Sequence, residues 1–206
     1  MDIIGLLLHF DQLIFSVVDI YGIYTYLIMF LVIFVETGLV IAPFFPGDTL
    51  LFAAGALAGL GKLNFGILFI LLALAAILGD SLNYFIGSKF GNFLLKKNWI
   101  SEEKVELTHK LYDKHGGKII IFGRFLPIIR TFAPFVAGMS KMNYRKFFSY
   151  NVSGAIVWVL SFLILGYFGG NWAPIRENFT LVILFILVLF IPITWWLKYL
   201  VKKEKI

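Results

Sequence analysis

The sequence predicts an all-α polytopic membrane protein that forms a single domain over residues 1–206. Hydrophobic residues occupy 60% of the chain and its mean hydropathy is +0.90, so a soluble domain of this size would expose far too much apolar surface. About four apolar segments have the roughly 20 residues that cross a hydrocarbon core of about 30 Å. Two more apolar segments are interrupted by proline and glycine, which favours two re-entrant hairpins.

The remaining elements follow from segment length and charge. Residues 5–18 are apolar but short and interrupted by acidic residues, which predicts an interfacial helix. Residues 92–117 are charged and predict a cytoplasmic loop that contains a short helix, with Ser101 as its N-cap and Gly116–Gly117 at its end. The expected spanning helices cover residues 22–41, 63–88, 147–170 and 178–197.

The two interrupted segments cover residues 43–60 and 119–139. In "PFFPGDTLLFAAGALAG" Asp48 is a candidate N-cap after the Pro-Gly pair, and in "GRFLPIIRTFAPFVAG" Thr131 is a candidate cap. Non-helical backbone inside a bilayer is stable only when it is buried in protein or lines a wet cavity. We therefore expect half-helices that meet at a bend, and a pair of kinked spanning helices is the alternative. The expected bends are at Pro43, Pro46, Gly47, Pro127 and Pro134.

An internal repeat relates the two halves of the chain. The segment "LAGLGKLNF" at 57–65 matches "VAGMSKMNY" at 136–144 with an offset of 79 residues. Each copy reads as a hairpin, a turn and a spanning helix. Lysine-rich loops face the cytoplasm, and clusters at 89–118, 141–146 and 198–205 place both termini there and give the copies opposite orientations. Inverted repeats of broken helices are typical of secondary transporters.

Four charged residues lie in or beside the hairpins. A charge at the centre of a spanning helix costs roughly 2.5–3.5 kcal/mol, so these residues must pair, face the interior or meet water. Arg124 and Arg130 are planar forks suited to a phosphate, and we predict that they bind one. Glu36 and Asp48 are predicted to couple protons, because a low dielectric makes a carboxylate easier to protonate. The alternative is two buried ion pairs that hold the hairpins together.

Other polar residues on the predicted helices are candidates for lining a cavity or for helix–helix hydrogen bonds. They are Asp80, Asn83, Thr131 and Asn151. The chain has no cysteine and only three histidines, none of them in a metal-ligand spacing, so we expect no metal and no cofactor. The net charge of +6 comes from lysines beside apolar spans, which favours anionic lipid headgroups over nucleic acid as a partner.

The segments "ETGLVIAPFFPGD", "GRFLPIIRTFAPFVAGM" and "YNVSGAIVW" make the chain resemble the DedA family of bacterial inner-membrane proteins, also known as the SNARE-associated or VTT-domain family. The resemblance implies paired re-entrant hairpins and transport linked to protons or membrane potential. Family members are assigned as flippases of undecaprenyl phosphate or phosphatidylethanolamine, and eukaryotic relatives scramble lipids. The family's essential acids match Glu36 and Asp48, and its essential arginines match Arg124 and Arg130.

The resulting hypothesis is a lipid flippase, not an enzyme, that moves undecaprenyl phosphate or a related phospholipid with the proton motive force. A passive scramblase and a proton-coupled exporter of small cations are the alternatives among transporters. A lipid phosphatase would need a nucleophile or general base beside the arginines, and no histidine lies in either hairpin. A structural or assembly factor is a further alternative, and a homo-oligomer is compatible with the sequence.

Overall fold

The computed structural model describes residues 20–39, 47–97, 99 and 102–171. Every regular element in this part of the chain is a helix, as the sequence predicts. The predicted interfacial helix at 5–18, the predicted span at 178–197 and the predicted bends at Pro43 and Pro46 lie outside the described residues. The elements are α3 (Tyr24–Gly38), α4 (Gly47–Gly59), α5 (Phe65–Lys96), α6 (Glu102–His115), α7 (Lys118–Phe122), the short 3-10 helix η1 (Gly123–Phe125), α8 (Pro127–Met139) and α9 (Tyr144–Asn171).

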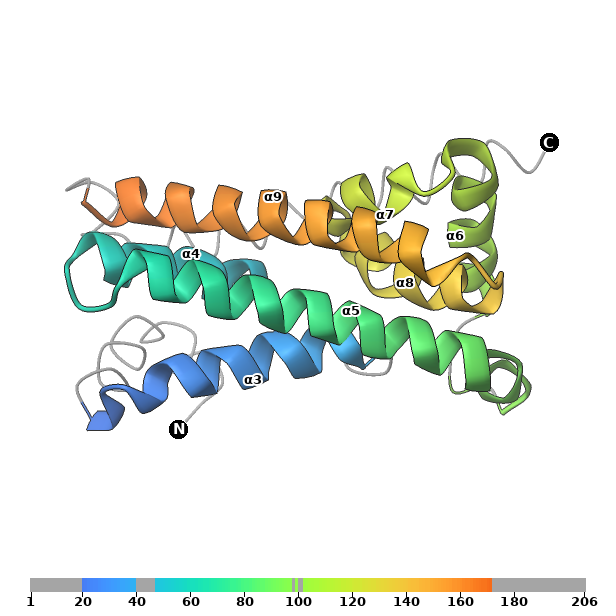
Figure 1. Ribbon diagram of the computed structural model, residues 1–206, viewed down its shortest axis with the longest axis horizontal. Helices are drawn as coiled ribbons and strands as arrows, with labels where there is room; N and C mark the ends of the chain where they lie inside the picture. The colour runs from blue at the N-terminus through green and yellow to red at the C-terminus, as the bar shows by residue number, and fades with distance from the viewer. Residues whose placement is uncertain (1–19, 40–46, 98, 100–101, 172–206) are drawn as a thin grey trace.

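Two long helices, α5 and α9, form the frame of the fold. Among the described residues they are the helices long and apolar enough to cross a membrane, and they run in opposite directions along the molecule (Figure 1). Helix α5 begins after Asn64, whose Oδ1 accepts a 3.0 Å hydrogen bond from the Ile67 N–H. It continues to Lys96 because no proline interrupts it. The prediction that this helix ends at residue 88 is therefore wrong, since the start of the predicted loop at 92–117 is helical.

The short helices α4 and α8 each pack against the long helix of the other repeat. Helix α4 lies along α9 and α8 lies along α5; α4 is in the left half of the view in Figure 1 and α8 in the right half. A Cβ on Gly166 of α9 would overlap the carbonyl of Phe52, and a Cβ on Gly87 of α5 would overlap the carbonyl of Phe135. The two glycines are 79 residues apart, which is the offset of the sequence repeat. The short helix of each copy thus packs against the long helix of the other copy, and the two long helices run in opposite directions.

The same kind of turn ends α4 and α8, but the second copy is one residue shorter. The left-handed residue of the turn is Gly61 (φ 74°) after α4 and Lys141 (φ 52°) after α8, which are 80 residues apart. The asparagines before the next helices, Asn64 and Asn143, are 79 residues apart. A constant offset therefore misplaces the helix ends by one residue. Backbone hydrogen bonds of 2.9–3.0 Å close both turns. After α4 the N–H groups of Gly61 and Lys62 donate to the carbonyls of Ala58 and Leu57, respectively. After α8 those of Lys141 and Met142 donate to the carbonyls of Gly138 and Ala137.

The second interrupted segment contains one break rather than two. Helices α7 and η1 lead to Leu126, whose backbone is extended (φ −116°, ψ 109°), and Pro127 opens α8. The helix then continues through Pro134, so Pro134 does not separate two half-helices. Proline removes the hydrogen bond to the carbonyl four residues earlier and its ring crowds that carbonyl, but the contacts of a buried helix can offset this cost. Thr131 lies inside α8 and is not its cap.

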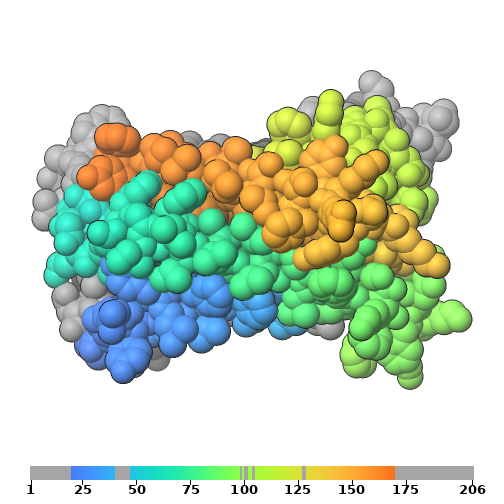
Figure 2. Space-filling view, viewed as in Figure 1, coloured from blue at the N-terminus to red at the C-terminus, as the bar shows by residue number. Residues whose placement is uncertain are grey.

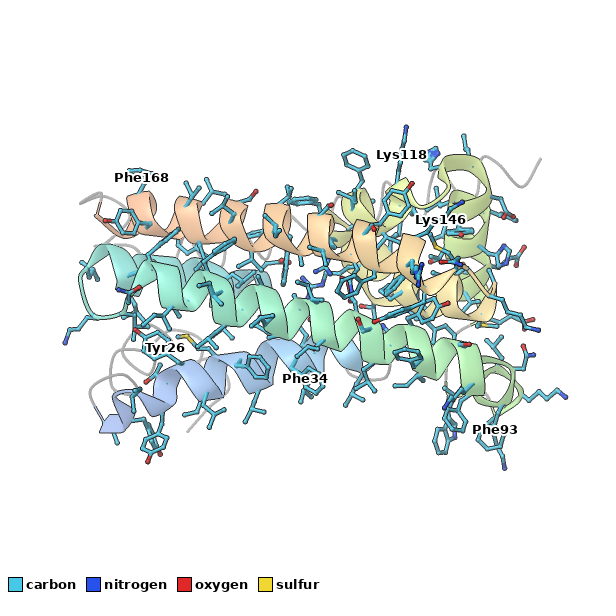
Figure 3. All side chains as sticks on the ribbon, in the orientation of Figure 1. Tyr26, Phe34, Phe93, Lys118, Lys146 and Phe168 are labelled. Carbon is cyan, nitrogen blue, oxygen red and sulfur yellow. The ribbon has the colours of Figure 1, made fainter. Side chains whose placement is uncertain are left out.

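Apolar side chains cover the outside of the long helices. Figure 2 shows α3, α5 and α9 side by side across one face of the molecule, and Figure 3 shows Phe93 and Phe168 projecting away from the bundle. A surface of this kind suits contact with lipid rather than water. Lys118 and Lys146 lie at the end of the molecule that α6 occupies (Figure 3). The most exposed apolar side chains include Ile23, Tyr24, Ile70, Leu165 and Phe168.

Candidate functional site

Acidic, basic and amide side chains from several helices converge inside the bundle. They come from the last turn of α3, the first turns of α4 and α8, the middle of α5 and α9, and η1. Because membrane interiors strongly disfavour charged groups, such a concentration in a chain with apolar spanning helices marks the candidate functional site. The residues are Glu36, Asp48, Asp80, Arg124, Arg130, Asn151 and Trp158.

Arg130 holds two carboxylates that come from different helices. Its Nη1 lies 2.9 Å from Asp48 Oδ1 on α4, and its Nη2 donates to Glu36 Oε1 on α3. The side chains of Arg130, Glu36 and Asp48 are 10%, 3% and 13% exposed, respectively. The predicted proton-coupling acids therefore share one arginine, which fits the expectation that buried charges pair.

Glu36 also closes the N-terminus of α4. Its Oε1 accepts a 3.1 Å hydrogen bond from the Gly47 N–H, which is the role that an N-cap side chain usually fills. A Cβ on Gly47 would overlap Glu36 Oε2, so any side chain there would displace the Glu36 carboxylate. The prediction that Asp48 is the N-cap is wrong: Asp48 lies within the first turn, and its Oδ1 faces Arg130 and Trp158.

Arg124 forms a second charged pair, with Asp80 of α5. Its Nη2 donates to Asp80 Oδ2 and, at 2.6 Å, to Asn151 Oδ1 on α9. Arg124 and Asp80 side chains are each 2% exposed. Asn151 Nδ2 in turn donates to the Ile77 carbonyl of α5 at 3.0 Å. Asp80 and Asn151, predicted as cavity or helix-contact residues, thus surround the second predicted phosphate-binding arginine.

The indole of Trp158 lies against both arginines. Its Nε1–H donates a 2.8 Å hydrogen bond to Asp48 Oδ1. The guanidinium carbon of Arg130 lies 4.9 Å from the ring centroid, and that of Arg124 lies 5.8 Å from it, distances at which cations are attracted to an aromatic ring. The sequence predicts that both arginines bind one phosphate. In the structure each arginine pairs with different acids, but both lie against the Trp158 ring.

Several buried polar atoms in the site have no hydrogen-bond partner among the described residues. Such atoms are unfavourable in a dry interior, so they favour a site that takes up water or a polar ligand. Two of them, Nε and Nη1, belong to Arg124, which therefore retains donors beside its bond to Asp80. The complete set is Glu36 Oε2, Thr49 Oγ1, Asp80 Oδ1, Asn83 Oδ1, Arg124 Nε and Arg124 Nη1.

Asn83 and Thr131 connect the helices around the site. Asn83 Nδ2 donates to the Thr131 carbonyl of α8 at 2.8 Å and to the Thr37 carbonyl of α3 at 3.4 Å. These bonds join α5 to the two helices that carry Arg130 and Glu36. Among the predicted bend residues, Gly47 and Pro127 begin α4 and α8, which places a helix start beside each half of the site.

Sequence reasoning missed Trp158 as a member of the site. The available signal was its spacing: Asn151, Gly154 and Trp158 recur at intervals of three and four residues, so they share one face of α9. Gly154 keeps this face open for Arg124, whose Nε would lie 3.1 Å from a Cβ at that position. Among the described residues no group of three or more acids, histidines or cysteines is arranged to hold a metal ion.

The comparisons with known proteins agree on one family. The model of the VTT domain matches residues 45–168. The chain is 48% identical to Protein DedA of Escherichia coli K12, over 90% of this chain and 87% of that protein. It is 40% identical to an uncharacterized membrane protein of Mycobacterium leprae, over 76% of this chain and 71% of that protein, and 36% identical to inner membrane protein YqjA of E. coli K12, over 71% and 68%. No solved structure matches the chain.

Proposed function

Because this chain belongs to the VTT-domain (DedA) family of membrane proteins, we propose that it carries a phosphate-bearing lipid across the membrane. Arg124 and Arg130 bind the phosphate, while Glu36 and Asp48 take up and release protons in the same cycle. The lipid tail stays in the bilayer throughout, and no covalent bond of the lipid changes.

The pairing of Arg130 with Glu36 and Asp48 is the observation that carries this proposal. Separate nitrogens of one guanidinium meet carboxylates from two helices, and this fork is also how arginine binds phosphate. A phosphate can occupy Arg130 only after the carboxylates leave it. Protonation removes their negative charge and so lets the phosphate compete. Protons on the acids and phosphate on the arginine then become coupled occupants of one site.

Charge balance gives a physical reason for this coupling. The site contains three carboxylates, on Glu36, Asp48 and Asp80, and two guanidiniums, on Arg124 and Arg130. With all five ionised there is already one excess negative charge. A phosphate adds to this excess in a low-dielectric interior unless protons enter with it. The N-terminus of α4, now closed by Glu36, offers the entering anion a helix dipole and a backbone N–H.

We place the site near the midplane of the bacterial inner membrane, between two re-entrant hairpins to which α4 and α8 belong. Each of these helices has 13 residues, about 20 Å and too short to cross the hydrocarbon core alone. The lysine-bearing end around α6 faces the cytoplasm in this arrangement, together with both termini. Movement of one inverted repeat against the other opens the site to each side in turn.

Undecaprenyl phosphate is the substrate that we propose first, with phosphatidylethanolamine as the second candidate. To test this, the protein is reconstituted in liposomes and an undecaprenyl phosphate analogue is followed across the bilayer, with and without an imposed pH gradient. Arg124→Ala and Arg130→Ala are compared with Arg145→Ala, which removes an exposed arginine. We expect gradient-driven movement in the wild type and in Arg145→Ala, and its loss in the other two variants.

Other outcomes separate the remaining functions. Movement that is independent of the gradient would favour a passive scramblase. Cation movement that needs the carboxylates but no phosphate lipid would favour the proton-coupled cation exporter. Release of inorganic phosphate from the lipid would contradict a carrier, and no movement above that of empty liposomes would contradict undecaprenyl phosphate as the substrate.

A further inference from the structure

Trp158 contacts both arginines and one of the acids. Its side chain is fully buried. Asp48 Oδ1 accepts hydrogen bonds from two donors at similar distances, 2.8 Å from Trp158 Nε1 and 2.9 Å from Arg130 Nη1. The Asp48 carboxylate is therefore shared between a charged donor and a neutral one. Packing of the indole ring in the bundle would not by itself require this hydrogen bond to Asp48.

We propose that Trp158 is a positioning residue of the carrier: its indole N–H holds the Asp48 carboxyl group when a lipid phosphate displaces that group from Arg130. The inference rests on the proposed function, because it concerns what happens to Asp48 as the phosphate binds. Trp158 acts through Asp48 and does not itself contact the phosphate.

The physical argument compares the site before and after phosphate binds. Before binding, Arg130 and Trp158 both donate to Asp48. After the phosphate takes Arg130, the indole N–H is the donor that remains for Asp48. Without that N–H the acceptor oxygen of the displaced, protonated carboxyl group would be buried without a donor, which is unfavourable. Loss of the indole N–H therefore weakens the phosphate-bound state more than the empty state.

The surroundings of Asp48 support a specific role for this N–H. The charged groups that face Asp48 are Arg130 from α8 and, on the same arginine, Glu36 from α3. Glu36 already accepts from the Gly47 N–H, so its carboxylate retains a backbone donor when Arg130 leaves. For Asp48 the corresponding donor is Trp158. Among the described residues, the two acids thus each have one donor besides Arg130.

The Trp158→Phe substitution distinguishes the contribution of the aromatic ring from that of the indole N–H. Trp158→Phe keeps an aromatic face for the arginines but removes the donor to Asp48. Binding of farnesyl phosphate to the purified full-length protein in detergent is measured by calorimetry, with farnesol as the probe that lacks the phosphate. We expect Trp158→Phe to bind farnesyl phosphate about tenfold more weakly than the wild type, because one buried hydrogen bond is lost. Trp158→Phe should bind farnesol as the wild type does. The control Trp99→Phe, at a tryptophan that is 62% exposed, should not change the binding of farnesyl phosphate.

A second variant tests whether the effect passes through Asp48. In an Asp48→Ala background there is no displaced carboxyl group, so adding Trp158→Phe should change farnesyl phosphate binding by less than about twofold. Thermal unfolding confirms that each variant is folded, and Asp48→Leu, which also lacks an acceptor, replaces Asp48→Ala if the latter does not fold. Wild-type affinity in Trp158→Phe, or a full tenfold loss that persists without the Asp48 carboxylate, would overturn this inference while leaving the proposed function intact. Equal binding of farnesyl phosphate and farnesol by the wild type would instead contradict the proposed function, and this inference with it.

Discussion

The carboxylate of Glu36 caps helix α4 from another helix: its Oε1 accepts a 3.1 Å hydrogen bond from the Gly47 N–H. The same oxygen pairs with Arg130. One side chain thus has a structural role at the start of α4 and an electrostatic role beside the arginine. The two roles can be separated by mutation, because an amide oxygen can cap a helix but carries no charge.

Glu36→Gln should keep the fold and lose proton coupling, whereas Glu36→Ala should lose both. The alanine variant removes the cap, which costs about 1 kcal/mol, so its midpoint of thermal unfolding should fall about 2–4 °C further than that of Glu36→Gln. The measurements are thermal unfolding in detergent and transport in liposomes. Identical unfolding midpoints for the two variants would show that the Gly47 contact does not stabilise α4.

Asp80→Asn should destabilise the protein strongly, because it leaves the buried Arg124 guanidinium without its acid. Breaking one partner of a buried ion pair typically costs about 3–5 kcal/mol. Chemical unfolding in detergent measures this loss, and Asp113→Asn, at an acid whose side chain is 69% exposed, is the control. The double variant Asp80→Asn/Arg124→Gln should recover much of the stability. A double variant no more stable than Asp80→Asn would argue that the pair does not act as a unit.

Gly87→Ala and Gly166→Ala should each destabilise the fold, since the added methyl group would overlap a backbone carbonyl of the short helix packed there. Overpacking of this kind costs about 1–3 kcal/mol. Gly66→Ala is the matched control: a Cβ there meets Asn64 Oδ1 at 3.4 Å, and alanine in a helix is favoured over glycine by about 0.5–1 kcal/mol. Stability changes of the same sign at all three positions would contradict the crossing geometry.

Arg130→Lys should reduce lipid transport at least tenfold although the charge is kept. A lysine ammonium is a compact point charge and cannot present the planar fork that meets two carboxylates or a phosphate. Arg145→Lys, at an exposed position, should transport like the wild type in the same liposome assay. Wild-type transport by Arg130→Lys would mean that charge alone suffices at this position.

The sequence identified the charged residues of the site but not their pairing. Glu36, Asp48, Arg124 and Arg130 were recognisable because charges in apolar segments are costly. Their partners depend on how α3, α4, α8 and α9 cross, and no local pattern records those crossings. Asp80 therefore was predicted as a residue of a cavity or a helix contact, whereas it pairs with Arg124.

The helix ends were also beyond local reasoning, and helical spacing alone places Trp158 on the face of Asn151 without revealing its partner. Pro134 reads as a helix breaker, but its place inside the buried helix α8 overrides that preference. Lys141 adopts the left-handed conformation that normally signals glycine, so the shorter second turn carries no glycine to mark it. Trp158 resembles many other aromatic residues of an apolar helix until its N–H is seen beside Asp48.

The exchange of protons for phosphate at Arg130 is tested most directly by counting protons during binding. Calorimetric titration of the protein with farnesyl phosphate, in buffers with different heats of ionisation, gives the number of protons taken up for each phosphate bound. A Glu36→Gln/Asp48→Asn variant is the matched reference, because its neutral amides leave Arg130 available without titrating. The account predicts that the wild type takes up more protons for each phosphate than this variant does. Equal proton uptake by two proteins that both bind the phosphate would contradict it.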